Sequence, residues 1–160
     1  MPDWKHIVAR YHAAAHSDDE HALVTGDGAL ASEIEKTGDE LGIKFPNEFA
    51  SLYGTYDGIG VGSDDDDIWW LFRPLDQLSQ FANTIRESFS ETHPETAERF
   101  FPFLDWANGD GMGYLMNESG EVLPGLYTFE HESFEFDEDQ ETEEFLSSIP
   151  VTIEEFLNSV

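Results

Sequence analysis

Hydrophobic patterning along the chain predicts an α+β fold, a single domain in which a mixed or antiparallel sheet is flanked by helices. Apolar residues recur at helical spacing over residues 1–57, whereas short apolar runs separated by glycine- and aspartate-rich segments follow from Gly58 onward. Composition agrees, because 39% of the 160 residues are hydrophobic and 13 Phe, 4 Trp and 5 Tyr supply the bulk of one core. We therefore expect residues 1–160 to form one domain.

The first helix is predicted by an apolar stripe at positions i, i+3, i+4 and i+7. The stripe consists of Trp4, Ile7, Val8 and Tyr11. Asp3 is placed to cap this helix, because its carboxylate can accept a hydrogen bond from a free backbone N–H of the first turn. Residues 17–28 contain Ser, Asp and Gly without a periodic apolar pattern, so we expect a polar connection there.

Two further helices are predicted between residues 30 and 57. Leu30, Ile34 and Leu41 share one face of the first, and Gly42 is placed to end it, since glycine readily adopts the left-handed conformation of a helix C-terminus. Pro46 opens the second at its first turn, where no intrahelical hydrogen bond is lost. The apolar side of that helix consists of Phe49, Leu52, Tyr53 and Tyr56.

Strands are predicted at residues 59–61 and 68–72, on either side of a loop with four consecutive aspartates. Trp69 and Trp70 are adjacent, so their side chains point to opposite faces of the sheet. If their strand is central, both rings belong to the core; if it is an edge, one ring is free to anchor a partner. We expect the core arrangement.

A helix is predicted from Pro74, with Leu75, Leu78, Phe81, Ala82, Ile85 and Phe89 at helical spacing. Strands at 101–106 and 114–116 flank a glycine turn at 109–113, and a further strand is expected over 122–129. Thr152, followed three residues later by Glu155, has the spacing of a capping box and predicts a short final helix.

Motifs for catalysis, cofactors and metals are weak. Residues 109–113 are glycine-rich, but a dinucleotide site needs a helix N-terminus after the glycines, and a strand is predicted there. The acids around Asp110 miss the ligand positions of an EF-hand calcium loop. His12 and His16 have a spacing that suits zinc, yet no third ligand follows at a fixed position, so a polar helix face is favoured. We expect no enzyme activity, no cofactor and no metal.

Net charge excludes several classes of partner. The chain has 35 Asp and Glu but only 7 Lys and Arg, a formal charge of −28. A protein this acidic cannot neutralise phosphates, which argues against nucleic acid, and anionic lipid repels it. The absence of Cys excludes disulfides and thiolate chemistry. Because neither a leader peptide nor a long apolar run is apparent, we expect a soluble, cytoplasmic protein.

The distribution of acids is the strongest functional signal. Arg99 is the last basic residue, and nine acids lie between Glu130 and Glu144. Residues 132–137 alternate acidic and aromatic side chains, so a strand there would present acids on one face. Such a surface attracts a basic protein, although general solubility or adaptation to high salt is an alternative reason for the acids. The expected partner-binding residues are Asp64, Asp65, Asp66, Asp67, Glu130, Glu132, Glu135, Asp137, Glu138, Asp139 and Glu141.

The order of three segments resembles a known family. Residues 34–58 contain a helix ending in Leu-Gly, a Phe-Pro pair that opens the next helix, and Asp-Gly after it. Residues 101–114 contain Phe-Pro-Phe followed by a Gly-Asp hairpin, and residues 153–157 read Ile-Glu-Glu-Phe-Leu. This order is similar to that of the SUKH superfamily, the Smi/Knr-like group, over about residues 30–160. Residues 1–28 would then be an N-terminal helical addition to the family domain.

The resemblance implies an α+β domain with a mixed sheet, flanking helices and no catalytic residues. Bacterial members of the superfamily are mostly immunity proteins that neutralise toxin domains of polymorphic, contact-dependent or secreted systems. Fungal members are scaffolds in signalling and in the control of cell-wall synthesis. We therefore expect a non-enzymatic immunity protein whose partner is a cognate toxin domain, basic and possibly a nuclease. A regulatory interaction scaffold is the alternative.

Overall fold

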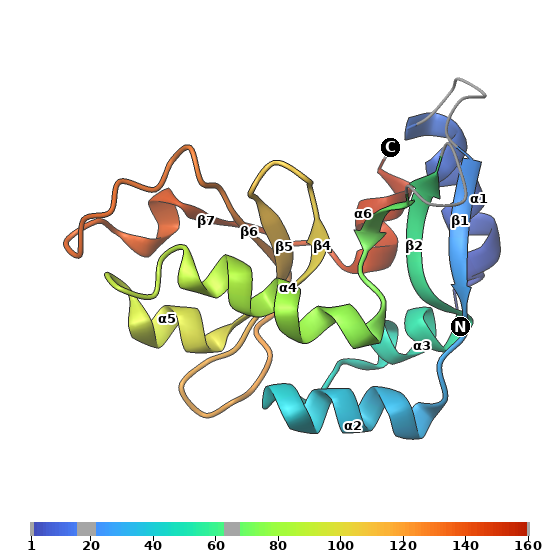
Figure 1. Ribbon diagram of the computed structural model, residues 1–160, viewed down its shortest axis with the longest axis horizontal. Helices are drawn as coiled ribbons and strands as arrows, with labels where there is room; N and C mark the ends of the chain where they lie inside the picture. The colour runs from blue at the N-terminus through green and yellow to red at the C-terminus, as the bar shows by residue number, and fades with distance from the viewer. Residues whose placement is uncertain (1, 16–21, 63–67, 160) are drawn as a thin grey trace.

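The computed structural model describes residues 2–15, 22–62 and 68–159, which form one antiparallel sheet flanked by helices (Figure 1). The helices are α1 (Trp4–Ala15), α2 (Ala31–Leu41), α3 (Asn47–Thr55), α4 (Leu75–Glu87), α5 (Pro94–Arg99), the 3₁₀ turn η1 (Thr142–Glu144) and α6 (Ile153–Asn158). The strands are β1 (Ala22–Asp27), β2 (Tyr56–Gly62), β3 (Ile68–Phe72), β4 (Phe100–Asp105), β5 (Gly111–Leu115), β6 (Leu126–Phe129) and β7 (Leu146–Ile149). The predicted α+β class is confirmed.

The seven strands follow one another in chain order, and each neighbouring pair is antiparallel. The junction between β3 and β4 differs from the others, since only Phe72 and Leu104 are in register there. Helices α4 and α5 form the connection between these two strands. The sheet therefore consists of two well-paired parts, β1–β3 and β4–β7, held together by a narrow contact.

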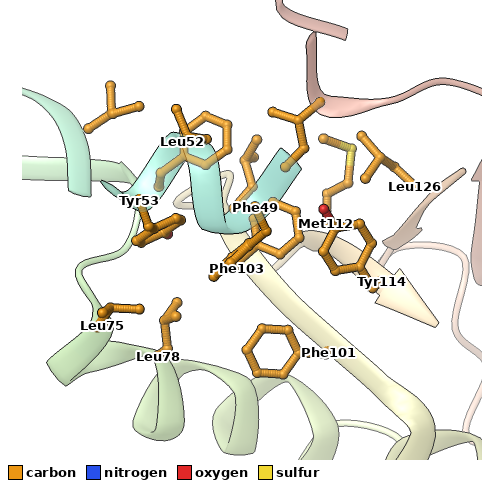
Figure 2. Close-up of a cluster of buried hydrophobic side chains, with 14 of the residues drawn as sticks. Phe49, Leu52, Tyr53, Leu75, Leu78, Phe101, Phe103, Met112, Tyr114 and Leu126 are labelled. Atoms are coloured by element: carbon orange, nitrogen blue, oxygen red, sulfur yellow. The ribbon is translucent and has the colours of Figure 1, made fainter. Parts of the chain in front are cut away.

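Aromatic side chains of β4 fill the core on both faces of the sheet. Phe103 packs against Phe49 of α3, with the two ring centroids 5.3 Å apart, and Phe101 belongs to the same buried cluster (Figure 2). Phe100 points to the opposite face and packs against Phe89 in a second cluster. The alternation follows from the period of two in a strand, and all six residues of β4 are buried.

Helix ends form as the sequence predicts. The carboxylate of Asp3 accepts a hydrogen bond from the backbone N–H of His6 at 3.3 Å. Gly42 follows α2 with φ +76°, the left-handed conformation expected for a glycine at that position. At α6, Thr152 Oγ1 accepts from the N–H of Glu155 at 3.1 Å while the Glu155 carboxylate accepts from the N–H of Thr152 at 3.3 Å. The capping box is confirmed.

The polar connection expected at residues 17–28 is wrong for its second half, because β1 occupies Ala22–Asp27 and pairs with β2. Gly26 and Gly28 look like turn residues in the sequence, but the fold uses them for close backbone contact. A Cβ atom on Gly26 would lie 2.0 Å from the carbonyl oxygen of Asp57. The glycines thus permit pairing of an edge strand.

Other differences concern element boundaries. Leu30, expected on the inner face of α2, precedes that helix and is 66% exposed, and Tyr56 begins β2 where a helical position was expected. The expected strand at 122–129 is confined to β6, apart from a single bridge between Met116 and Val122. Gly111 belongs to β5, although a turn was expected there. Helix α5 and strand β7 were not predicted.

Candidate partner-binding surface

Residues 130–144, called the acidic loop below, connect β6 to β7 and protrude at one end of the longest axis (Figure 1). The strand expected at residues 132–137 is wrong, since the segment consists of a turn, a bend and irregular backbone. Phe136 adopts φ +57°, which a strand cannot contain. Consequently the two phenylalanines do not share a face: Phe134 is buried, whereas Phe136 is 75% exposed.

Phe134 anchors the acidic loop to the core. Its ring centroid lies 5.0 Å from that of Phe145 and 6.0 Å from that of Phe129, and Phe89 contributes a further ring at 6.5 Å. These rings meet edge-on or tilted, the geometries that aromatic pairs prefer. The packing of Phe134 on these buried rings thereby holds the irregular backbone of the acidic loop against the core.

Gln140 holds the acidic loop together from within. This buried side chain donates from Nε2 to the carbonyl oxygen of Ser133 at 2.8 Å and accepts at Oε1 from the N–H of Glu135 at 2.9 Å. The ring nitrogen Nε2 of His93 lies 2.8 Å from the carbonyl oxygen of Gln140, which ties the loop to the start of α5. The amide thus supplies hydrogen bonds that a strand partner would otherwise provide.

A second tie joins the acidic loop to the turn between β4 and β5. The carboxylate oxygen Oδ1 of Asp110 accepts from the backbone N–H of His131 at 3.0 Å and lies 2.5 Å from Nδ1 of the same residue. The two contacts share one oxygen atom and fix the first residues of the loop. The loop is therefore attached on two sides, at α5 and at the β4–β5 turn.

The acids of the loop face solvent. Each of the following side chains is exposed: Glu132, Glu135, Asp137, Glu138, Asp139, Glu141, Glu143 and Glu144. Glu130 is half-buried at the base of the loop. Among the described residues, none of these carboxylates forms an ion pair with a Lys, an Arg or a His. The loop therefore presents a concentrated, unneutralised negative charge on a fixed backbone.

Phe136 is an exposed aromatic residue among the acidic side chains of the loop. Its side chain is the most exposed of the large hydrophobic residues in the described structure, and its ring lies 4.6 Å from that of Phe134. A left-handed conformation of a non-glycine residue costs about 1–2 kcal/mol. The fold thus maintains an exposed aromatic ring at a strained position, an observation that favours a role in binding.

The second set of predicted residues, Asp64 to Asp67, lies outside the described residues. The strands on either side of it, β2 and β3, belong to the first part of the sheet. In Figure 1, β1 and β2 lie at the opposite end of the longest axis from the acidic loop. A role of Asp64 to Asp67 in binding stays a prediction, and the candidate surface within the described residues is the acidic loop.

The core arrangement expected for Trp69 and Trp70 is wrong. Trp69 is 43% exposed and Trp70 is half-buried, with its ring close to Gly58 and Pro74. Strand β3 lies between β2 and β4 in the sheet, but its residues Ile68–Leu71 do not pair with β4. Over these residues β3 therefore has a neighbouring strand on one side only and is less covered than a fully paired central strand. Trp69 lines an apolar groove of about 210 Å³ between α1 and β1–β3, together with Tyr11 and Trp106.

Two partly buried carboxyl groups with raised pKa values accept hydrogen bonds at the starts of helices. Burial raises the pKa of Glu48, although its carboxylate accepts hydrogen bonds from the backbone N–H of Ile153 and from the hydroxyl of Tyr114. Burial also raises the pKa of Asp57, whose carboxylate accepts from the N–H of Leu75 at 2.7 Å. Both acids satisfy free N–H groups at helix starts, at α6 and α4 respectively.

No group of three or more His, Cys, Asp or Glu side chains within residues 2–15, 22–62 and 68–159 is placed to hold a metal ion. In the same part of the chain, no helix is long and apolar enough to cross a membrane. His12 lines the Trp69 groove, while His16 lies outside the described residues.

Comparison with known proteins identifies the family. A search of curated proteins finds no match. A family model described as the SMI1 / KNR4 family (SUKH-1) matches residues 28–159, which include α2 to α6 and the strands from β2 onward. Helix α1 and strand β1 lie before the matched region. The match confirms the resemblance drawn from the sequence, and the chain belongs to the SMI1 / KNR4 family (SUKH-1).

Proposed function

We propose that this protein is a non-enzymatic immunity protein that binds a cognate toxin domain in the cytoplasm and blocks its active site. Family membership supports this role, since the SUKH group is known for immunity proteins. The observation that carries the proposal is the acidic loop, a segment held by Phe134, Gln140 and Asp110 whose exposed carboxylates have no ion-pair partners among the described residues.

The chemistry of this surface favours a basic partner. Unneutralised carboxylates on one loop steer a basic protein and raise its association rate by roughly one to three orders of magnitude at low salt. A toxin that cleaves nucleic acid has a basic cleft for phosphates, and an acidic loop can occupy that cleft by imitating phosphate charge. Because Phe134, Gln140 and Asp110 fix the loop in advance, little ordering entropy is lost on binding.

A toxin domain, if the neighbouring genes encode one, supplies the test of the proposal by co-expression with this chain. We expect the chain to restore growth of cells that express the toxin and to inhibit the purified toxin at a one-to-one ratio. Failure of the chain to protect cells from a neighbouring toxin that it was shown to meet in the same compartment would contradict the proposal.

Charge-neutralised variants separate this role from the alternative of a regulatory scaffold. Replacing Glu135, Asp137, Glu138 and Asp139 with Gln or Asn removes four charges from the loop. A loss of protection assigns binding to the loop. Unchanged protection would indicate that these acids only keep the protein soluble and that another surface binds the toxin. The scaffold role is favoured if the wild-type chain neither protects cells nor inhibits the purified toxin.

A further inference from the structure

A groove lies between the C-terminal end of α4 and the acidic loop. Its volume is about 370 Å³. Four phenylalanines and two glutamates contribute to its lining: Phe89, Phe129, Phe134, Phe136, Glu87 and Glu91. The groove thus combines residues from the end of α4 with residues that follow β6, two segments far apart in sequence.

The aromatic residues form a floor and one wall. Phe89 and Phe129 are fully buried and stacked, with their ring centroids 5.0 Å apart and their planes at 20°. Phe134 continues this floor towards the loop, and Phe136 rises from it as an exposed wall. The lining of the groove thus contains four aromatic rings, of which that of Phe136 is open to solvent.

The charges on the rim all have one sign. Glu87 and Glu91 are exposed, and neither has an ion-pair partner among the described residues. Arg86, the neighbour of Glu87, turns away and donates from Nε to the carbonyl oxygen of Phe100 at 2.6 Å. His131 also lines the groove, but its Nδ1 is held by Asp110. Lining residues thus provide two free carboxylates and no Lys or Arg.

We infer that this groove binds an arginine side chain of the protein partner, an inference that rests on the proposed function. The aliphatic part of an arginine fits an apolar wall, and its guanidinium group stacks on an aromatic face while it pairs with a carboxylate. Phe136 and the two glutamates supply both requirements at one place. Lysine is bound more weakly, because its ammonium group is more strongly hydrated and cannot stack.

Other occupants fit the groove less well. An anionic group would be repelled by Glu87 and Glu91. A purely apolar side chain would fill the floor but would also bring two carboxylates out of water without a partner, which opposes binding. The strained conformation of Phe136 is explained by the inference, since a left-handed backbone at this position keeps the ring at the groove and out of the core.

The probe for the experiment is N-acetyl-arginine amide, titrated into the ¹⁵N-labelled protein. We expect weak binding, with amide shifts concentrated at residues 87–92 and 131–136. N-acetyl-citrulline amide has nearly the same shape without the charge, and it should cause much smaller shifts. Phe136→Ala and the double variant Glu87→Gln/Glu91→Gln should each weaken binding about two- to fivefold, the range for exposed cation–π and ion-pair contacts.

A matched control removes the same charge elsewhere. Glu118 and Glu121 are exposed and lie in a turn without an aromatic wall. Glu118→Gln/Glu121→Gln should leave arginine binding unchanged. Equal shifts from arginine and citrulline, shifts outside the groove, or equal weakening by the control pair would each overturn the inference. The amide spectrum of every variant shows directly whether the fold is retained.

The experiment contains no toxin, so its result is independent of the proposed function. Arginine binding by a chain that fails to protect cells would retain the groove and reject the immunity role. Absence of arginine binding in a chain that does protect cells would reject the groove and leave the immunity role to the exposed acids of the loop.

Discussion

Replacement of Gln140 by alanine tests whether the acidic loop is held in advance of binding. The side chain is buried and forms two hydrogen bonds to loop backbone, one to the carbonyl oxygen of Ser133 at 2.8 Å and one from the N–H of Glu135 at 2.9 Å. Gln140→Ala removes both and leaves the two backbone groups without these partners. The core beneath, including Phe134, is unchanged by the substitution.

The magnitude follows from the number of bonds. Each hydrogen bond contributes about 0.5–1.5 kcal/mol, so loss of both lowers the free energy of opening the loop by about 1–3 kcal/mol. Since about 1.4 kcal/mol corresponds to a factor of ten, the backbone N–H of Glu135 should exchange with solvent about 5- to 150-fold faster. Gln140→Glu keeps the acceptor and loses the donor, so its effect should be intermediate.

Native-state hydrogen exchange measures this effect residue by residue. The N–H of Glu130 bonds to the carbonyl oxygen of Phe145 at 2.8 Å, outside the reach of Gln140, and serves as an internal control. We expect fast exchange at Glu135 and little change at Glu130. If Glu135 exchanged at the wild-type rate in Gln140→Ala, the claim that this amide fixes the loop would be refuted.

Three further predictions concern stability and exposure. Phe49→Ala should lower the free energy of unfolding by about 3–5 kcal/mol in chemical denaturation, because the ring is fully buried and stacks on Phe45 at 4.0 Å and Tyr53 at 4.3 Å. Burial raises the pKa of Glu48, so its protonated form is favoured by folding, and stability should fall as the pH rises above the ordinary pKa of the group and through the raised one; melting temperatures of Glu48→Gln, measured over the same pH series, should show a weaker loss than those of the wild type. Trp69→Phe should remove a large part of the fluorescence that acrylamide quenches, since Trp69 is 43% exposed; unchanged quenching would mean that the groove is closed in solution.

Much of the fold could be predicted from local signals in the sequence. The stripe containing Trp4 and Val8, the apolar side of α3, and the capping box at Thr152 each define an element without reference to the rest of the chain. Strand β3 was predicted at its observed bounds, because aspartates precede its run of apolar residues and Arg73 and Pro74 follow it. These signals depend on spacing of about 3.6 or 2 residues and on end caps.

The remaining elements depend on contacts that a sequence does not display. Strand β1 has little periodicity of its own and forms because β2 pairs with it, with Gly26 lying against the backbone of Asp57. The two tryptophans were placed in the core because β3 was expected to be covered on both sides. The narrow pairing with β4 at Phe72 leaves Trp69 uncovered, and no local pattern indicates such a narrow junction.

The acidic composition of the candidate site was predicted from the sequence, but its backbone conformation was not. Its charge was evident from the nine acids between Glu130 and Glu144. The alternation around Phe134 indicated a strand, but the buried Gln140 provides the hydrogen bonds that a neighbouring strand would have provided. Apolar periodicity does not indicate a polar residue that is buried inside a loop, because the partners of such a residue are backbone groups.

The central claim is that the acidic loop attracts a basic toxin domain by its charge. Association rates measured by stopped flow between the chain and the toxin domain that it is found to neutralise, over a range of salt concentrations, test this claim most directly. The variant neutralised at Glu135, Asp137, Glu138 and Asp139 should associate more slowly and depend less on salt. A control that neutralises the exposed acids Glu35, Asp39, Glu40 and Glu118 should keep nearly the wild-type rate and salt dependence. Equal losses in both variants would contradict the claim, because they would show that total charge and not the loop determines association.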